Sequence, residues 1–407
     1  MDEKGLLERA RRVGPKIGTA AAVGAVGTAV LSSLASVGTA TYFARRVLTP
    51  EQDKKDDTVI RAVGEGTVTL TAAPHTLAPG RYGLWLERGA GHARLGDVLP
   101  SDLTPRRALD RTVVREVLGV DAGVLEIGPA RWNSYFYCGD PRMALGLPFE
   151  DVLVSSDVGE LPAWQVPPAD PTARPGEWAV LVHGRSARRE ETLRALPVLH
   201  EMGLTALVPL YRNDIGAPRS IDGRYNLGLS EWRDIEAAIR YAVAQGARSV
   251  ALLGWSMGGA IVLQTLSRSE LRGWVDAVVL DCPVIDWGDV LRHQADLNKI
   301  PRSVDLLARL LMGRKATRHL VGVAEPIDLA VTNWVERAEE MTHRLLLIHT
   351  TTDQTVPFGP SVALAERRPD LVQLDLWDGP LHCREWNTDQ PRWERTVREF
   401  LDPPSSA

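Results

Sequence analysis

The sequence is poor in cysteine and has no excess of basic residues. Its 407 residues include only Cys138, Cys282 and Cys383, an odd and sparse set that forms no disulfide framework. No Cys-x-x-Cys or His-Glu-x-x-His pattern occurs, so we expect no metal. A net charge of −5 leaves no basic footprint, which argues against a nucleic-acid partner. The remaining composition, 44% hydrophobic and 24% charged, is typical of a globular protein.

Charged residues are also missing from positions 17–44, a run long enough to cross a hydrocarbon core of about 30 Å. We expect these residues to form one membrane helix after a short tail at 1–16. More basic residues precede the run than follow it directly, which favours a single-pass protein with its large domain on the extracytoplasmic side. A cleaved export signal is the alternative, since Arg11 and Arg12 precede the run and small residues lie near Ala40.

The next two segments are a linker and a β-rich accessory domain. Residues 45–57 are polar and charged, as expected for a linker. Residues 58–150 contain short alternating stretches, including "RYGLWLER", in which Tyr82, Leu84 and Leu86 share one face. The stretch "SYFYCG" at 134–139 is another expected strand. The sequence assigns this domain no chemistry.

Residues 151–402 alternate between apolar strands and amphipathic helices. Strands that are apolar throughout and separated by helices predict a parallel sheet that is covered on both faces, which is an α/β fold. A helical insertion at about 287–335 interrupts the alternation. It is amphipathic enough to form a cap over a substrate pocket, although a plain packing helix would have the same pattern.

One strand of this domain ends in "GWSMGG", and a helix follows directly. A serine between Gly254 and Gly258 is typical of a nucleophile elbow, because side chains at those two positions would collide where the strand folds back beside the helix. Ser256 would then lie at the helix N-terminus, which favours a developing negative charge. The alternative is a tight turn with an incidental serine.

A serine nucleophile needs a base and an orienting acid, in the chain order Ser, acid, His. Asp353 follows the apolar strand at 345–349, and His382 follows the next strand. His382 is the only histidine after Asp353, so chain order selects it. Asp281, at the end of the strand "VVLDCP", is the rival for the acid.

The fourth requirement is an oxyanion hole. The early strand "WAVLVHG" ends at Gly184, which lets the backbone of the next residue approach a substrate oxygen. We therefore expect the N–H groups of Arg185 and Met257 to be the donors. The Arg185 side chain could contact an anionic substrate group or simply be solvated.

These segments together resemble the α/β-hydrolase superfamily across roughly residues 161–402. "VLVHG", "GWSMGG", "DQTVP" and "GPLH" match its oxyanion loop, elbow, acid loop and histidine loop, in that order. The resemblance implies an α/β-hydrolase fold with a mostly parallel eight-stranded sheet. It also implies that Ser256 is the nucleophile, Asp353 the acid and His382 the base.

A partial resemblance to prolyl-oligopeptidase-type serine hydrolases lies in "LVPLYRNDIGAPRS" and "EWRDIEAAIRYA". Those peptidases carry an N-terminal propeller of several four-stranded blades, for which residues 58–150 are too few. The sequence therefore predicts a membrane-anchored serine hydrolase that cleaves small-molecule carboxylic esters without a metal or organic cofactor. A serine peptidase, or a non-catalytic binding protein of hydrolase fold, is the alternative.

Overall fold

The structure is a computed structural model that describes residues 36–51, 54–100 and 111–402. The predicted tail at 1–16 and the first part of the predicted membrane helix, up to residue 35, lie outside the described residues. No helix within the described ranges has both the length and the apolar character needed to span a membrane.

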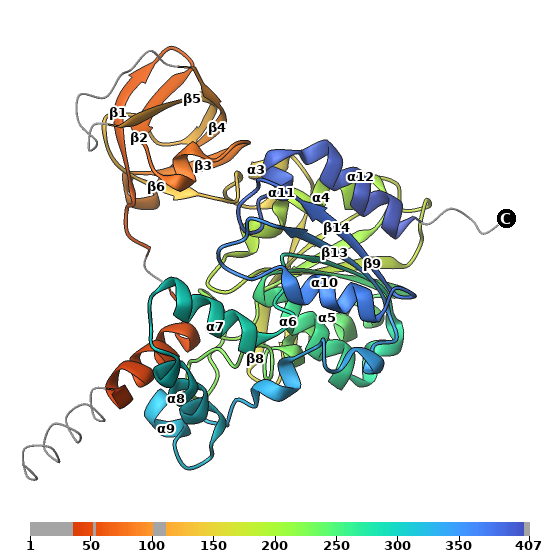
Figure 1. The fold of residues 1–407 in the computed structure, drawn as a ribbon. Helices are drawn as coiled ribbons and strands as arrows, with labels where there is room; N and C mark the ends of the chain where they lie inside the picture. The colour runs from red at the N-terminus through yellow and green to blue at the C-terminus, as the bar shows by residue number, and fades with distance from the viewer. Residues whose placement is uncertain (1–35, 52–53, 101–110, 403–407) are drawn as a thin grey trace, which may run out of the picture. The chain divides into compact units, whose positions relative to one another are not determined.

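Residues 36–48 form a helix, so the first four residues of the predicted linker are helical. Its buried residues, Ala40, Phe43, Ala44 and Leu48, recur at the spacing of one helical face. Residues 36–47 form a compact unit with 295–326, which contains α8 (Arg302–Gly313) and α9 (Arg318–Val321). In Figure 1 the red helix lies beside α8 and α9, and Arg45 Nε donates to the Leu320 carbonyl at 3.0 Å.

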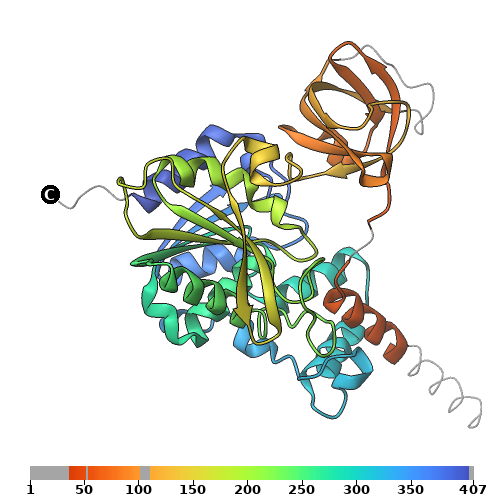
Figure 2. The same ribbon diagram turned by 180° about the vertical axis from the view of Figure 1, so that it is seen from behind.

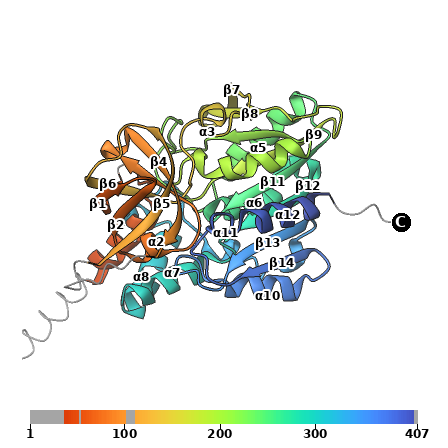
Figure 3. The same ribbon diagram turned by 90° about the horizontal axis from the view of Figure 1, so that it is seen from above.

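The β-rich domain is a closed six-stranded barrel with the order β1-β2-β5-β4-β3-β6, and all its strand pairs are antiparallel. Its strands can be followed in Figures 1 and 3. Tyr82, Leu84 and Leu86 are all buried, as their alternation predicts. Closure pairs every strand on both sides, so no exposed edge is left. The strands are β1 (Thr58–Gly64), β2 (Thr67–Thr71), β3 (Tyr82–Leu86), β4 (Gly91–Leu99), β5 (Thr112–Ala122) and β6 (Gly128–Asn133).

The prediction of a strand at 134–139 is wrong. The chain turns there, because the Asn133 side-chain oxygen accepts the Tyr135 N–H at 2.9 Å and Phe136 adopts a φ of 68°. An asparagine that binds the backbone two residues on favours a turn over an extended strand. Phe136 and Tyr137 pack instead against Trp386 of the α/β domain, with ring centroids 5.8 Å and 5.7 Å from that indole.

The α/β domain is built on an eight-stranded sheet with the order β14-β13-β12-β11-β9-β10-β8-β7. Only β8 runs against its neighbours, so the prediction of a mostly parallel eight-stranded sheet is confirmed. The β7–β8 hairpin forms one edge of the sheet, and β14 forms the other (Figure 2). The strands are β7 (Glu150–Ser156), β8 (Gly159–Val166), β9 (Glu177–Val182), β10 (Thr205–Pro209), β11 (Ser249–Trp255), β12 (Val275–Asp281), β13 (Arg344–Thr350) and β14 (Val372–Trp377).

Helices cover both faces of this sheet, which explains why its central strands are apolar throughout. In Figure 1, α4 and α12 lie on one face, and α5, α6 and α10 lie on the other. The carboxyl ends of β11 to β14 meet at one edge, where parallel sheets carry their sites. The helices are α4 (Leu196–Glu201), α5 (Trp232–Ala244), α6 (Met257–Arg268), α7 (Trp287–Leu297), α10 (Gly359–Arg367), α11 (Glu385–Thr388) and α12 (Gln390–Leu401).

Candidate active site

Ser256 lies at the corner between β11 and α6. Its φ of 53° and ψ of −116° are unusual for a residue with a side chain. Two backbone hydrogen bonds, to the end of β12 and to the loop that follows it, keep it there. The Ser256 N–H donates to the Asp281 carbonyl at 3.0 Å, and the Ser256 carbonyl accepts from the Val284 N–H at 3.1 Å. Strain that neighbouring hydrogen bonds maintain in this way is typical of a functional corner.

The glycines on both sides of Ser256 are required by the close approach of the backbone. A Cβ at Gly254 would lie 2.8 Å from the carbonyl carbon of Gly258, and a Cβ at Gly258 would lie 2.1 Å from the Val182 carbonyl oxygen. Neither distance is compatible with a side chain. The spacing of the two glycines therefore has the steric cause that the sequence indicates.

The structure brings Asp353 and His382 together. His382 Nδ1 lies 2.6 Å from Asp353 Oδ2, and the two residues come from the loops after β13 and β14. The other carboxylate oxygen, Asp353 Oδ1, accepts the backbone N–H groups of Thr355 at 2.7 Å and Val356 at 2.9 Å. The carboxylate is thus fixed on one side by backbone and orients the imidazole on the other.

A second histidine, His349, also contacts this carboxylate, with Nε2 at 3.3 Å from Asp353 Oδ2. Burial alone would raise the pKa of Asp353, but His382 and His349 outweigh burial and hold that pKa far below its usual range. Asp353 is therefore ionised at any physiological pH, as an acid that orients a histidine must be. Sequence reasoning missed His349, because a histidine inside an apolar strand gives no signal of its contacts.

Asp281, the rival acid, points elsewhere. Its Oδ2 accepts the indole N–H of Trp393 on α12 at 2.9 Å. Its Oδ1 is buried and has no hydrogen-bond partner among the described residues. Since His382 is paired with Asp353, the geometry favours Asp353 for the acid.

The second nitrogen of His382, Nε2, lies 3.6 Å from the thiol sulfur of Cys383. Among the described residues, no hydrogen bond joins this nitrogen to the Ser256 hydroxyl. Such contacts often tighten only when substrate binds. Burial opposes ionisation of His382, but Cys383 and Asp353 outweigh it and raise the pKa of the imidazole above its ordinary value.

The loop after β9 carries Arg185, one of the two predicted oxyanion donors. The peptide unit that contains the Arg185 N–H begins at the Gly184 carbonyl. This carbonyl accepts from the Tyr211 hydroxyl at 2.9 Å and lies 3.0 Å from His183 Nδ1. Because C=O and N–H point in opposite directions in a trans peptide, fixing the carbonyl orients the Arg185 N–H. A Cβ at Gly184 would lie 3.3 Å from Ser256 Cβ, so this peptide adjoins the elbow.

Two further residues, Asp214 and Glu191, support this loop, and sequence reasoning missed both of them. Asp214 accepts from His183 Nε2 at 2.9 Å and from the Tyr211 N–H at 2.8 Å. Glu191 accepts the Gly184 N–H at 2.7 Å. Burial lowers the pKa of His183, but the Asp214 carboxylate outweighs this and raises it. The only sequence signal for these contacts is polar residues that follow apolar strands.

Met257, the other predicted oxyanion donor, is the first residue of α6 and is fully buried. The Arg185 side chain turns away to the segment before the barrel, where its Nη2 donates to the Thr49 carbonyl at 3.0 Å. The backbone N–H of Arg185 is therefore the part of this residue that fits the predicted oxyanion role. The contact with Thr49 gives no support to a role of the Arg185 side chain in binding a substrate.

A cavity of about 350 Å³ adjoins the same loop. It is lined by aromatic and charged side chains, but not by Ser256, Asp353 or His382 among the described residues. The described cavity is therefore not lined by the predicted reacting side chains. Its lining includes Trp85, Arg131, Tyr135, Arg188 and Tyr225.

Comparison with protein families matches residues 179–404 to the alpha/beta hydrolase family. Residues 59–133, which form the barrel, match a domain of unknown function (DUF8805). No curated protein sequence matches this chain.

Solved structures of esterases resemble the chain in fold. An esterase from Pyrococcus furiosus superposes with a TM-score of 0.50 at 18% identity, over 65% of this chain and 93% of its own. Est1E from Butyrivibrio proteoclasticus gives a TM-score of 0.45 at 17% identity, over 62% and 97% of the two chains. An esterase from Exiguobacterium antarcticum gives 0.45 at 17% identity, over 62% and 99%. At these identities the likeness concerns the fold alone.

Proposed function

Because the chain belongs to the alpha/beta hydrolase family, we propose that it is a serine hydrolase that cleaves small-molecule carboxylic esters through an acyl-Ser256 intermediate. Asp353 is the acid, and His382 is the general base. The observation that carries the proposal is the 2.6 Å contact between His382 Nδ1 and Asp353 Oδ2, at the same sheet edge as the strained Ser256.

The residues divide the reaction in the following way. His382 takes the Ser256 proton as the hydroxyl oxygen attacks the ester carbonyl, and it later returns a proton to the leaving alcohol. Asp353 holds the imidazole in orientation and stabilises its charged form. The N–H groups of Arg185 and Met257 bind the oxyanion of the tetrahedral intermediate. A water molecule then gives a proton to His382 and attacks the acyl group on Ser256, which releases the carboxylic acid product and returns the proton to Ser256.

Covalent labelling tests the proposal directly. A fluorophosphonate probe should label the wild-type chain at Ser256, and the Ser256→Ala variant should stay unlabelled. Peptide mapping of the adduct identifies the residue. A folded wild-type chain that resists the probe and hydrolyses no p-nitrophenyl ester would overturn the assignment in favour of a non-catalytic binding protein.

The preference for esters over amides is the finer part of the proposal. Amide cleavage needs a placed route for protonating a poor amine leaving group, and the prolyl-oligopeptidase-type enzymes add a propeller. The β-rich domain of this chain is a six-stranded barrel instead. We expect a higher kcat/KM for p-nitrophenyl acyl esters than for matched p-nitroanilides. Equal or faster anilide turnover would favour a peptidase.

Membrane attachment through the N-terminal segment is a separate proposal. It is supported by the absence of charged residues from 17–44, with basic residues on the N-terminal flank. Residues 36–44 of that run bury one helical face in the compact unit that they form with residues 295–326. The test therefore removes residues 1–34 only. The full chain should sediment with membranes and the truncated chain should not, while both hydrolyse esters. A truncated chain that still sediments would contradict the anchor.

A further inference from the structure

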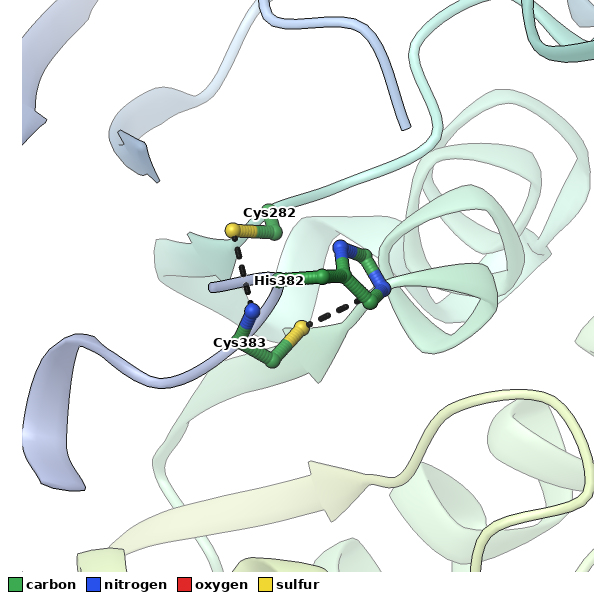
Figure 4. Close-up of side chains that lie close together, drawn as sticks. All are labelled: Cys282, His382 and Cys383. Atoms are coloured by element: carbon green, nitrogen blue, oxygen red, sulfur yellow. Dashed lines mark hydrogen bonds between the residues drawn. The ribbon is translucent and has the colours of Figure 1, made fainter. Parts of the chain in front are cut away.

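Two of the three cysteines lie against the candidate catalytic histidine. Cys282 follows β12 and Cys383 follows His382, and both are buried. The Cys383 N–H donates to Cys282 Sγ at 3.2 Å. In Figure 4 one dashed line joins Cys383 Sγ to the His382 ring, and the other joins Cys282 Sγ to the backbone nitrogen of Cys383. The two thiols are thus neighbours in space although 101 residues separate them in the chain.

The spacing of the three side chains suits one small thiophilic cation. A sulfur of each cysteine and a ring nitrogen of His382 all lie within 4.8 Å of one another. His382 Nε2 and Cys383 Sγ are 3.6 Å apart. A tetrahedral zinc ion with usual Zn–N and Zn–S bond lengths separates such ligands by about 3.5 Å. Only small movements would therefore close a site around a metal.

The other ring nitrogen of His382 is already arranged as a metal-binding histidine requires. Nδ1 faces Asp353 Oδ2 at 2.6 Å. Histidines that bind zinc commonly donate their second N–H to a carboxylate, which fixes the ring and makes the metal-binding nitrogen more basic. The acid–base pair of the proposed triad thus also has the arrangement of a carboxylate–histidine–zinc unit.

Buried carboxylates without full partners flank the two thiols, which is an independent sign of an attraction for a cation. Glu385 is fully buried, and its Oε1 accepts the Cys282 thiol at 3.0 Å. Its Oε2, like Asp281 Oδ1, has no hydrogen-bond partner among the described residues. One oxygen of each of these carboxylates lies within 4.8 Å of Cys282 Sγ. An unpaired buried oxygen is costly unless a positive charge or donor approaches.

We propose that Cys282, His382 and Cys383 form a binding site for a thiophilic divalent cation, with zinc as the best fit. Both thiols lose their protons to solvent on binding, and the two thiolates balance the charge of the ion. His382 contributes the lone pair of Nε2. The fourth position is left for water or a nearby carboxylate.

The consequence for activity rests on the proposed function. A metal on Nε2 occupies the lone pair that would accept the Ser256 proton, so the zinc-loaded chain cannot use His382 as a base. The site is therefore inhibitory. Loss of the ion frees Nε2 and restores the acid–base pair.

Binding is tested first, without reference to activity. The full-length chain is kept reduced with a phosphine, freed of metal and titrated with Co²⁺ as a spectroscopic probe for the zinc site. Expected are one ion per chain, a thiolate-to-cobalt charge-transfer band, and loss of that band when Zn²⁺ is added. Absence of the band from the folded wild-type chain would overturn the proposal without need of any variant.

Variants then locate the site. Cys282→Ser and Cys383→Ser should each weaken Zn²⁺ binding by at least about 100-fold, more than the loss of a group that merely orients a ligand. Cys138→Ser is the matched control, because Cys138 is the third buried thiol and lies outside the cluster. Ser256→Ala should bind Zn²⁺ as the wild type does. A cobalt band that persists in Cys282→Ser, or disappears in Cys138→Ser, would place the metal elsewhere.

Inhibition is measured last, with each chain compared with its own metal-free rate on p-nitrophenyl acetate. Half-inhibition by Zn²⁺ should occur at the Kd from the binding experiment, and a chelator should reverse it. In Cys282→Ser and Cys383→Ser this concentration should rise by the same factor as the Kd. Zinc that binds without slowing an active enzyme would overturn the inhibitory role. A metal-free chain without esterase activity that still binds cobalt would contradict the proposed function and leave the metal site standing.

Discussion

The barrel and the α/β domain each hold a histidine against an aspartate, yet the two pairs differ at the second ring nitrogen. In the barrel, His92 Nδ1 lies 2.8 Å from Asp121 Oδ2, and Nε2 lies 2.9 Å from the Asn133 amide nitrogen. In the catalytic domain, His382 Nδ1 lies 2.6 Å from Asp353, and Nε2 meets a thiol. The second nitrogen of His92 is thus occupied by the Asn133 amide, whereas that of His382 faces the reactive thiol of Cys383.

A third pair, His183 with Asp214, lies between these extremes. His183 Nε2 faces the carboxylate at 2.9 Å, and Nδ1 faces the Gly184 carbonyl at 3.0 Å. With an oxygen acceptor at each nitrogen, this histidine orients a backbone peptide and has no lone pair for a substrate proton. Histidine and aspartate in contact are therefore not evidence of catalysis by themselves. What the second nitrogen meets decides the role.

The largest effect should come from Ser256→Ala, which removes the group that His382 is proposed to serve. We expect kcat/KM for an ester to fall by about 10⁴-fold or more, with little change in Tm because the lost oxygen leaves no large cavity. Ser267→Ala, further along α6, is the control and should keep the wild-type rate. If the folded Ser256→Ala chain still hydrolysed esters, the His382–Asp353 pair would have no more claim to a catalytic role than the His92–Asp121 pair of the barrel.

Asp353→Asn should rank second, with a loss in kcat of about 10⁴-fold, since an amide cannot hold the imidazole in the required form. Asp281→Asn is its matched control, because an asparagine oxygen can still accept the Trp393 indole N–H. Steady-state kinetics on a p-nitrophenyl ester measure both. If Asp281→Asn proves the inactive variant, the contact between Asp353 and His382 is structural only.

Asp214→Asn tests the intermediate pair. It should leave Ser256 and His382 in place while loosening the peptide that presents the Arg185 N–H. We expect kcat to fall by no more than about 10²-fold, because one complete oxyanion donor is worth roughly 10²–10³. KM should change little, since this donor acts in the transition state. A large rise in KM at constant kcat would indicate substrate binding instead of oxyanion stabilisation.

The smallest effect on activity is expected in the barrel. Asp121→Asn should leave kcat/KM at the wild-type value but lower the free energy of unfolding by about 1.5–3 kcal/mol, the usual range for a hydrogen bond to a charged group. Burial would raise the pKa of Asp121, but its bonds to His92 and Arg94 outweigh this and lower it. The stabilisation that ionised Asp121 gives the folded state is therefore fully present above the ordinary aspartate pKa. It is lost as the pH falls through the lowered pKa of Asp121.

Denaturant unfolding of wild-type and Asp121→Asn chains across acidic pH checks this sign. The difference between the two free energies should shrink on acidification. A barrel variant that loses ester turnover while remaining folded would mean that the β-rich domain takes part in the chemistry.

Much of the catalytic domain was predictable because its signals are local. A run of apolar residues that ends in glycine, serine and glycine can only turn in a few ways, and the acid and base follow later strands in fixed order. The barrel was harder. Short alternating stretches indicate strands but not closure, and the aromatic stretch at 134–139 was assigned to a strand because the Asn133 turn was not recognised.

The sequence by itself determined the alternation of strands and helices, the elbow at Ser256 and the order in which Asp353 and His382 occur. These features depend on residues close together in the chain, where side-chain size and periodicity act directly. Tertiary structure alone decided that His382 pairs with Asp353 and not Asp281, and that Cys282 and Cys383 flank its ring. Those contacts join loops from different strands of one sheet edge, and only the packing of the strands sets which side chains meet.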